Sequence, residues 1–332
     1  MSLKIGIIVL NWQNWPQTLH CLDSLKQLQP LGQTMIIVCD NASSNDSFER
    51  ILAWGRHHDA EFELWSKPPT IEEIPERFYP WVLIQTGANL GFAGGNNVGI
   101  RYALAHHCDY VWVLNNDTQV DPQALVQLHR CMQQHPQLAL VGSTLIDAQK
   151  RDTVQCAGGC RYFPWLTVFK PLLGGYSLQA VMHYQQPLKL DYVAGAAMFF
   201  RAAVLRQVGL LNEEYFLFYE ELDYTQRLKR QGYTIGWCQH SLVYHQGSAS
   251  VGTVEAGTRD QLRRANYYEN LSTLKYTARF YPARLIGVMA VRFVLKSLVL
   301  ILRRDFYLLA PLLSAYRDFI RFNSNASRSE SL

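Results

Sequence analysis

Three polar residues, Asn115, Asn116 and Asp117, directly follow a short apolar run that begins at Tyr110. The run is β-branched and aromatic, which predicts a buried strand of a parallel sheet. Open α/β sheets bind ligands where their strands end, so polar side chains at such an end indicate a site. The Asp117 carboxylate could hold a divalent cation against the phosphates of a nucleotide. A polar turn into a helix capped by Asp121 explains this segment equally well.

Polar residues also end the first two predicted strands. The apolar run over residues 5–10 ends in Asn11, and the run over residues 35–39 ends in Asp40, with Ser43 close behind. Each of these strands thus ends in polar side chains, as the run that begins at Tyr110 does. For Asp40, an Asx turn that only closes the strand is the structural alternative.

A glycine-rich stretch follows the third predicted strand, at residues 82–85. It reads Asn-Leu-Gly-Phe-Ala-Gly-Gly-Asn-Asn-Val-Gly over residues 89–99. Glycines let a backbone approach a ligand closely, and a helix N-terminus beyond them offers free N–H groups to phosphate. The stretch matches neither the dinucleotide-binding fingerprint nor the P-loop.

Strands alternate with helices along the first two thirds of the chain. Helices are predicted over about 16–28 and 47–54, and the proline-containing residues 57–80 are predicted to be a surface insertion. This alternation predicts a right-handed, mostly parallel α/β sheet with flanking helices. We expect residues 1–255 to form this domain, and residues 256–332 to form a basic, helical C-terminal region.

Taken together, the motifs resemble those of the inverting GT-A glycosyltransferases of family 2, and within it the rhamnosyltransferase type. The resemblance spans roughly residues 4–250 and implies a GT-A fold, which is Rossmann-like. The ordered motifs are Asp40-Asn-Ala-Ser43, the stretch over 89–99, Asn115-Asn-Asp117, Gly195–Arg201, Phe216–Asp223 and His245–Ser250.

The resemblance also implies roles for these residues. Asp40 would accept the N3–H of a pyrimidine base, which selects uracil or thymine over cytosine. Asp117 would bind the metal, Mg²⁺ or Mn²⁺, with His245 completing the coordination, and imidazole suits Mn²⁺ better. Asn115 stands where the family's D-x-D motif has its first aspartate. The implied donor-binding residues are Asn11, Asp40, Ser43, Asn89, Gly91, Asn96, Asn97, Asn115 and Asn116.

Inversion requires one base that deprotonates the acceptor hydroxyl as the nucleoside diphosphate leaves. The family's base is the second acid of a Glu-Asp pair at a helix start, and Glu220-Glu221 occupies that position here. Asp223 is the other candidate, but it falls four residues before Arg227 and could instead form a helix ion pair. We therefore favour Glu221 over Asp223 as the catalytic base.

The C-terminal region is basic and apolar. Residues 259–332 hold 13 Lys or Arg against 5 Asp or Glu, although the whole chain carries only +4. Residues 285–302 form an apolar segment whose charges, Arg292 and Lys296, would lie in one cationic stripe with Arg303. Such a helix is expected to lie in the interface of an anionic membrane rather than to span it. A helix packed on the catalytic domain is the alternative.

The sequence thus predicts a cytoplasmic enzyme, peripheral at the inner face of the cell membrane. The resemblance to the rhamnosyltransferase type implies that it moves rhamnose from dTDP-rhamnose to a polysaccharide or lipid-linked glycan acceptor, and no nucleic acid partner is expected. A UDP-hexose or UDP-galactofuranose donor is the alternative within this class, and a non-catalytic nucleotide-sugar-binding protein is the alternative outside it. The seven cysteines lack a Cys-x-x-Cys pair, and the N-terminus has no signal-peptide pattern.

Overall fold

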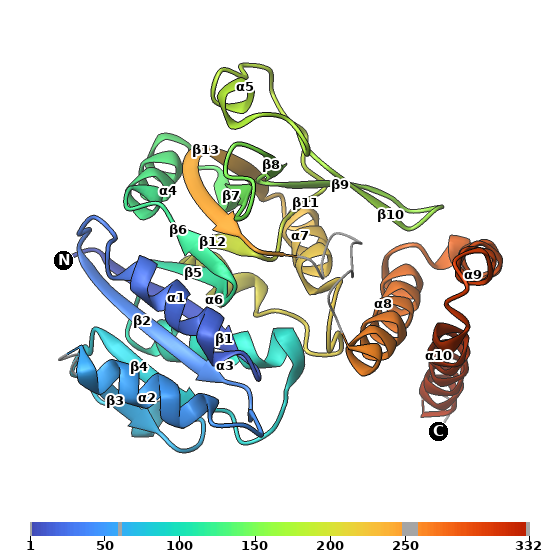
Figure 1. Cartoon of the computed structure of the whole chain (residues 1–332), viewed down its shortest axis with the longest axis horizontal. Coiled ribbons are helices and arrows are strands. Elements are labelled where there is room, and N and C mark those ends of the chain that lie inside the picture. The colour runs from blue at the N-terminus through green and yellow to red at the C-terminus, as the bar shows by residue number, and fades with distance from the viewer. Residues whose placement is uncertain (1, 59–61, 248–257, 330–332) are drawn as a thin grey trace. The chain divides into compact units, whose positions relative to one another are not determined.

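The computed structural model describes residues 2–58, 62–247 and 258–329, with side chains as far as Phe322. The described residues divide into two compact units (Figure 1). The first unit comprises those within 1–161, 170–213 and 221–246, and the second comprises those within 162–169, 214–220 and 247–332. Both units are therefore assembled from segments that lie far apart in the sequence.

Ten strands in the described part of the first unit form one sheet, in the order β3-β4-β2-β1-β5-β12-β7-β13-β6, with β8 paired to β7. The strands from β3 to β5 run parallel, β12 runs antiparallel between β5 and β7, and β13 runs parallel to β7. The bounds are β1 (Lys4–Asn11), β2 (Gln33–Asp40), β3 (Phe62–Trp65), β4 (Trp81–Gln85), β5 (Tyr110–Asn115), β6 (Thr118–Val120), β7 (Leu138–Asp147), β8 (Val154–Ala157), β12 (Ala197–Arg201) and β13 (Thr234–His245).

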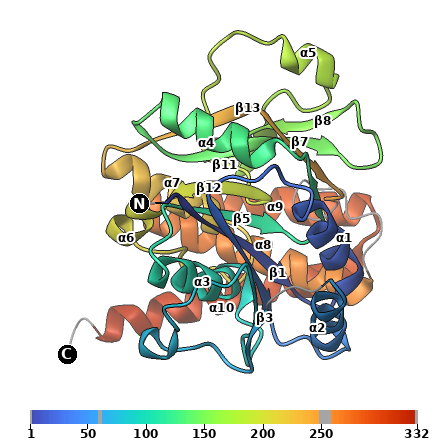
Figure 2. The ribbon, with the colours of Figure 1, turned by 90° about the vertical axis from the view of Figure 1, so that its left-hand side faces the viewer.

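Helices cover both faces of this sheet, which is why its parallel strands are continuous apolar runs. Ile7 and Ile8 are neighbours in β1, point to opposite faces and are both fully buried. Figure 2 shows α1 (Trp15–Leu25) and α2 (Ser47–His57) on one side of the strands, and α3 (Gly91–Ala105) and α6 (Ala202–Val208) on the other. The predicted mostly parallel α/β sheet is confirmed. The other helices and strands between residues 71 and 230 are α4 (Ala124–Gln134), α5 (Leu178–Met182), α7 (Glu220–Arg230), the 3-10 turn η1 (Ile71–Glu73), β9 (Gly159–Phe163), β10 (Val168–Pro171) and β11 (Tyr192–Val193).

The surface insertion predicted over residues 57–80 is wrong in part, because β3 lies within it. Phe62 places its ring where any Cβ on Gly55 would stand, and the ring stacks on Trp81 with centroids 6.4 Å apart. These contacts hold a four-residue edge strand against β4. A strand this short, followed by several prolines, has no periodicity from which it could be predicted.

The second unit is built largely from α8 (Arg259–Phe280), α9 (Leu285–Leu302) and α10 (Leu309–Ser329), joined by the 3-10 turns η2 (Pro282–Arg284) and η3 (Phe306–Leu308). Thr258 and Gln261 form a capping box that starts α8. The helices share a small core of Leu274, Leu300, Leu312, Tyr316 and Phe319. The segment Pro282–Leu302 is long and apolar enough to cross a membrane, judged by length and composition alone.

The cationic stripe predicted on α9 does not face outward, so that expectation is wrong. Arg292 is only 5% exposed, and its guanidinium donates to Glu269 at 2.9 Å and to Asn270 at 2.9 Å. Lys296 donates to the same Glu269 carboxylate at 2.8 Å. The cations turn toward α8 because a buried charge needs a partner, and Glu269 supplies one.

Candidate active site

The ends of β1, β2 and β5 meet at one edge of the sheet in the first unit. Asn11 pairs in register with Asp40, and Leu10 pairs with Asn115. The register follows from the parallel pairing of β1 with both neighbours. The three polar strand ends singled out from the sequence are therefore side by side.

Asp40 is fully buried and accepts four hydrogen bonds from the chain itself. Asn11 Nδ2 donates to it at 2.6 Å, Gln85 Nε2 at 2.9 Å, Ser43 Oγ at 2.6 Å and Ser43 N at 3.1 Å. Four donors fill the acceptor sites of a carboxylate. An N3–H of a base can therefore reach Asp40 only where one of these donors gives way.

A chain of hydrogen bonds connects Asp40 to the turn after β5. Asn116 Nδ2 donates to Thr18 Oγ1 at 2.9 Å, and Thr18 Oγ1 donates to Asn11 Oδ1 at 2.7 Å. Asn11 in turn donates to Asp40. Neither Thr18 nor Gln85 was singled out from the sequence. Gln85, in register with Asp40 at the end of β4, could have been found from the strand pairing.

Asp117 and His245 face each other, with His245 Nε2 3.3 Å from Asp117 Oδ1. Gln155 Nε2 donates to the carbonyl of His245 at 2.9 Å, so Gln155 Oε1 is the atom that faces His245 Nδ1, also at 2.9 Å. This arrangement keeps one imidazole proton on Nδ1. A second proton on Nε2 would join the imidazole to Asp117 Oδ1, and a divalent cation could take the place of that proton.

The surroundings keep Asp117 ionised. Burial acts to raise the pKa of Asp117, but the hydrogen bond and charge of His245, with a further hydrogen bond from Asn115, hold it below its ordinary value. Asn115 Oδ1 is buried and has no hydrogen-bond partner among the described residues. Carboxylate, amide oxygen and imidazole are all ligands that Mn²⁺ accepts.

The protein alone does not complete a coordination sphere here. Within the described ranges, no group of three or more His, Cys, Asp or Glu converges on a metal-sized space. Asp117, His245 and Asn115 could therefore supply part of a sphere, with phosphate oxygens and water supplying the rest.

Glu221 lies near the same strand end. Asn115 N donates to the carbonyl of Ala196 at 3.0 Å, which joins the end of β5 to the residues just before β12. A Cβ on the neighbouring Gly195 would stand 3.8 Å from the Glu221 carboxyl carbon and 4.0 Å from the Phe92 ring. The Glu221 carboxylate, whose Oε2 is buried, thus stands over a backbone position without a side chain.

Asp223, the other candidate base, is fully buried and faces Arg227. Arg227 Nε donates to Asp223 Oδ1 at 2.7 Å. The same guanidinium donates to the carbonyls of Val208 at 3.0 Å and Leu210 at 2.6 Å. Asp223 therefore forms part of a buried ion pair that fastens α7 to the segment after α6.

The glycine-rich stretch is helix rather than loop, so its expected role changes. Gly91 begins α3 with a φ of +71°, and Asn89 Oδ1 accepts its N–H at 3.1 Å. A Cβ on Gly95 would stand 2.5 Å from Leu10, and one on Gly99 would stand 2.6 Å from Ile8. These two glycines let α3 pack closely on β1, and phosphate is not needed to explain them.

The two asparagines of this stretch are buried and bonded to the protein. Asn96 Nδ2 donates to the carbonyl of Phe92 at 2.9 Å. Asn97 Nδ2 donates to the carbonyl of Leu211 at 2.8 Å and to Glu213 at 2.9 Å, and Asn97 Oδ1 accepts from Leu211 N at 3.1 Å. Asn97 is thus committed to holding the segment after α6, while Asn96 keeps a buried carbonyl oxygen without a partner in the described chain.

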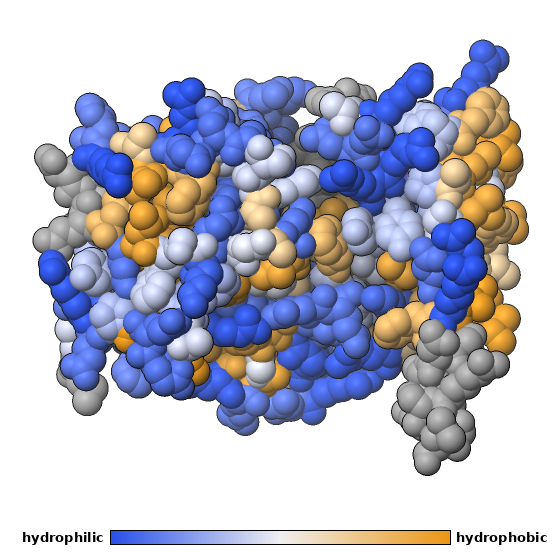
Figure 3. Space-filling view, turned by 90° about the horizontal axis from the view of Figure 1, so that it is seen from below, coloured by the Kyte–Doolittle hydropathy of each residue, from blue (hydrophilic) through white to orange (hydrophobic). Residues whose placement is uncertain are grey.

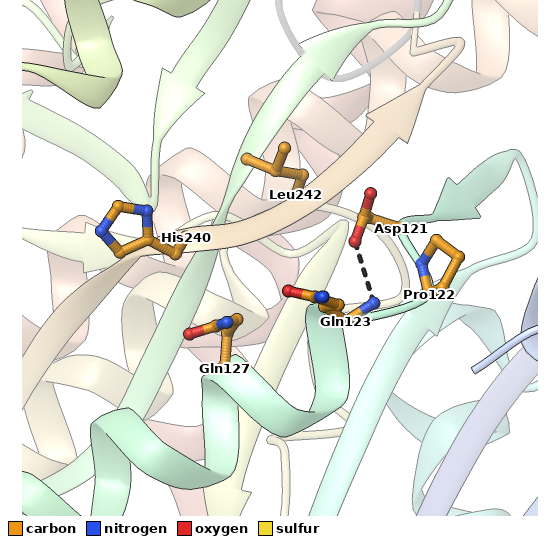
Figure 4. A pocket seen from close by; sticks show the side chains of 6 residues that line it. All are labelled: Asp121, Pro122, Gln123, Gln127, His240 and Leu242. Atoms are coloured by element: carbon orange, nitrogen blue, oxygen red, sulfur yellow. Dashed lines mark hydrogen bonds between the residues drawn. The ribbon is translucent and has the colours of Figure 1, made fainter. Parts of the chain in front are cut away.

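A separate shallow hollow of about 430 Å³ lies between the start of α4 and β13 (Figure 4). Asp121 Oδ1 accepts there from Gln123 N at 2.9 Å. Helix α4 starts at Ala124, slightly later than expected from Asp121 as its N-cap. None of the predicted site residues lines this hollow, whose lining is Asp121, Pro122, Gln123, Gln127, His240 and Leu242.

A family model described as glycosyltransferase-like family 2 matches residues 71–267, more than half of the chain. The chain belongs to this family. Its fold is GT-A, a mostly parallel sheet with flanking helices, followed by a C-terminal helical stretch with one apolar helix.

Solved structures support the fold assignment. A mannosyltransferase from Pyrobaculum calidifontis, in complex with GDP-Man and Mn²⁺, is 12% identical with a TM-score of 0.52, over 95% of this chain and 86% of that one. GalNAc-T7 with UDP, GalNAc and Mn²⁺ is also 12% identical, with a TM-score of 0.56, over 84% of this chain and 50% of that one. At this identity the likeness concerns the fold alone.

A relative by sequence is the low-salt glycan biosynthesis hexosyltransferase Agl10 of Haloferax volcanii. It is 24% identical over 236 residues, which cover 71% of this chain and 64% of the relative. The match therefore spans less than two thirds of that relative's length.

Proposed function

We propose that this protein is an inverting hexosyltransferase that uses a nucleoside diphosphate sugar and a divalent cation. The observation that carries the proposal is the contact between Asp117 Oδ1, just after β5, and His245 Nε2, at the end of β13, which lie 3.3 Å apart. Membership in the family and the hexosyltransferase relative support the reaction class.

Asp117 and His245 would hold the cation, with the amide oxygen of Asn115 beside them. A Mn²⁺ or Mg²⁺ ion held there would neutralise the negative charge that develops on the departing diphosphate. The two neighbouring structures that contain Mn²⁺ share the fold and make such an ion a reasonable cofactor here.

Glu221 would act as the base. Its carboxylate takes the proton of the acceptor hydroxyl while that oxygen bonds to the anomeric carbon and the nucleoside diphosphate leaves from the opposite face. Gly195 leaves open the space in front of this carboxylate. Asp223 is less suited, since its ion pair with Arg227 already uses one of its oxygens.

The donor would be a pyrimidine nucleotide sugar, with Asp40 accepting from the base after Gln85 or Ser43 gives up its bond. The motifs of the rhamnosyltransferase type make dTDP-rhamnose the first donor to test. The hexosyltransferase relative favours a UDP-hexose or UDP-galactofuranose as the second.

The acceptor would be a polysaccharide or lipid-linked glycan at the cytoplasmic face of the cell membrane. The apolar helix α9 supports membrane association. Arg292 and Lys296 fasten α9 to α8, which itself carries Arg263, Arg264 and Glu269. Because α9 could cross a bilayer only by drawing this charged helix with it, α9 would lie in the interface.

The proposal is tested with a panel of labelled nucleotide sugars, with and without Mn²⁺. A thermal shift with one donor identifies the ligand, and release of nucleoside diphosphate in the presence of a glycan acceptor identifies the transferase. Retention of the sugar without such release would identify a non-catalytic binding protein and contradict the proposal.

A further inference from the structure

Two segments of the second unit that lie far apart in the sequence each carry several exposed apolar side chains. Figure 3 shows hydrophobic surface along the right-hand edge, where the C-terminal helices lie. Soluble monomers rarely expose contiguous patches of this kind. The members, which we call the apolar face, are Phe163, Trp165, Leu166 and Val168 from the first segment, and Ile286, Val291, Val294, Leu295, Leu298, Val299, Ile301 and Leu302 from α9.

The two segments touch, so they form one surface. The Trp165 ring packs on Gly287, where any Cβ would stand 3.2 Å from the ring, and the Arg284 guanidinium lies 5.3 Å from the ring centroid. The buried Thr167 Oγ1 accepts from Arg292 Nη1 at 2.6 Å. Residues 163–168 are thereby held on α9 from both sides.

The apolar face is free of charge along the length of α9. The two charged residues within the helix, Arg292 and Lys296, are turned inward to Glu269. Cations stand only at its ends, with Arg284 before the helix and Arg303 and Arg304 after it.

We propose that the apolar face inserts into the boundary between headgroups and acyl chains of an anionic bilayer, with residues 163–168 as a second insertion element and Trp165 as its anchor. Tryptophan favours the membrane interface, and the terminal arginines suit anionic headgroups. A second copy of the chain fits less well, because a two-fold antiparallel pairing of α9 would bring Arg284 against Arg303. The inference deepens the membrane association proposed above and extends it to a segment outside the C-terminal helices.

The test uses the full chain and flotation with vesicles of phosphatidylcholine alone or with about a third phosphatidylglycerol. The loop variant carries Trp165→Ser and Leu166→Ser, and a helix variant carries Val294→Ser and Leu298→Ser. The matched control carries Tyr176→Ser and Ile71→Ser, which are 55% and 72% exposed in the first unit, against 54% for Trp165.

We expect the loop and helix variants each to bind anionic vesicles roughly tenfold more weakly, since each loses two apolar side chains from the membrane. The control should bind like the wild type, and all variants should unfold at the wild-type temperature. Loop variants that float like the wild type would refute the insertion of residues 163–168. Wild-type protein that ignores vesicles but dimerises by light scattering would assign the apolar face to a second copy.

These readouts do not depend on catalysis. Thermal shift by nucleotide sugars, measured on the same variants, reports the proposed function separately. Loss of vesicle binding with unchanged donor binding therefore supports the inference even if the donor assignment changes.

Discussion

At the scale of single residues, the contact between Asp117 Oδ1 and His245 Nε2, which either a proton or a divalent cation can bridge, is the feature that most directly indicates a cation site. Asp117→Asn should leave the fold intact, because the residue stands at a strand end and Asn keeps its shape. We expect Mn²⁺-dependent turnover to fall by roughly 10²-fold or more, since the cation loses its anionic ligand. Calorimetry of Mn²⁺ with the nucleoside diphosphate is the second measurement. Near wild-type turnover of this variant would show that Asp117 only serves the turn after β5 and does not bind the cation.

The choice between the two acids is also a question of single residues. Glu221→Gln should lower the rate by roughly 10²–10⁴-fold and leave donor binding unchanged, as expected for a general base. Asp223→Asn should instead cost roughly 1–3 kcal/mol of stability, because it weakens a buried bond to Arg227. Chemical denaturation and steady-state kinetics separate the two effects. If the Glu221→Gln protein is active while the Asp223→Asn protein is stable but inactive, Asp223 is the base and Glu221 is not.

At the scale of elements, α8 holds the segment that precedes Glu221. Ser272 Oγ donates to the carbonyl of Leu217 at 2.8 Å, and the Thr273 hydroxyl lies 2.9 Å from that of Tyr219. Phe218 and Tyr219 have φ of +67° and +74°, a backbone strain that outside contacts must maintain.

Thr273→Val should therefore lower kcat more than it raises the donor KM, because the strained segment leads directly into Glu221. Thr277 is the matched control, since it is buried one turn later on α8 and its hydroxyl bonds to the carbonyl of Thr273. Thr277→Val should turn over like the wild type. Equal effects of both changes would reduce Thr273 to a packing residue.

The contact of α8 with α9 predicts a response to acid. Burial acts to raise the pKa of Glu269, but the charges of Arg292 and Lys296 lower it to about 2. Because the pKa of Glu269 is lower in the folded protein, its ionisation stabilises the folded state at any pH above the ordinary pKa of 4.5. This contribution disappears as the pH falls toward 2. The unfolding midpoint of Glu269→Gln should lie below that of the wild type at neutral pH, and the difference should shrink below about pH 4.5. A constant difference would exclude this linkage.

The elements also show what can be predicted from the sequence. Strands β1, β2, β4 and β5 contain uninterrupted apolar runs, so their existence was predictable, and the polar residues at the ends of β1, β2 and β5 could be read from the sequence. Gln155 could not be chosen, because its partner His245 lies 90 positions away and comes close only through the pairing of both strands with β7. The inward orientation of Arg292 could not be predicted either, because its partner Glu269 lies 23 positions earlier, on another helix.

At the scale of the whole molecule, the C-terminal helices are a folded part and not a removable tail. Leu274 of α8 is fully buried against residues of α9 and α10. Deleting residues 283–332 should therefore lower the unfolding temperature and promote aggregation, because it exposes this core and leaves Glu269 without its cations. Differential scanning fluorimetry and sedimentation check this. A truncated protein as stable and soluble as the full chain would show that α8 does not need α9 and α10 to bury its apolar side.

The line of hydrogen bonds from Asn116 through Thr18 and Asn11 to Asp40 has a consequence for the two places that it joins. All its donors point the same way and it ends on a carboxylate, so each bond strengthens the next. It fixes the spacing between the place proposed for the base and the place proposed for the diphosphate. A substitution in the middle of this line, at Thr18, would therefore disturb both of its ends at once.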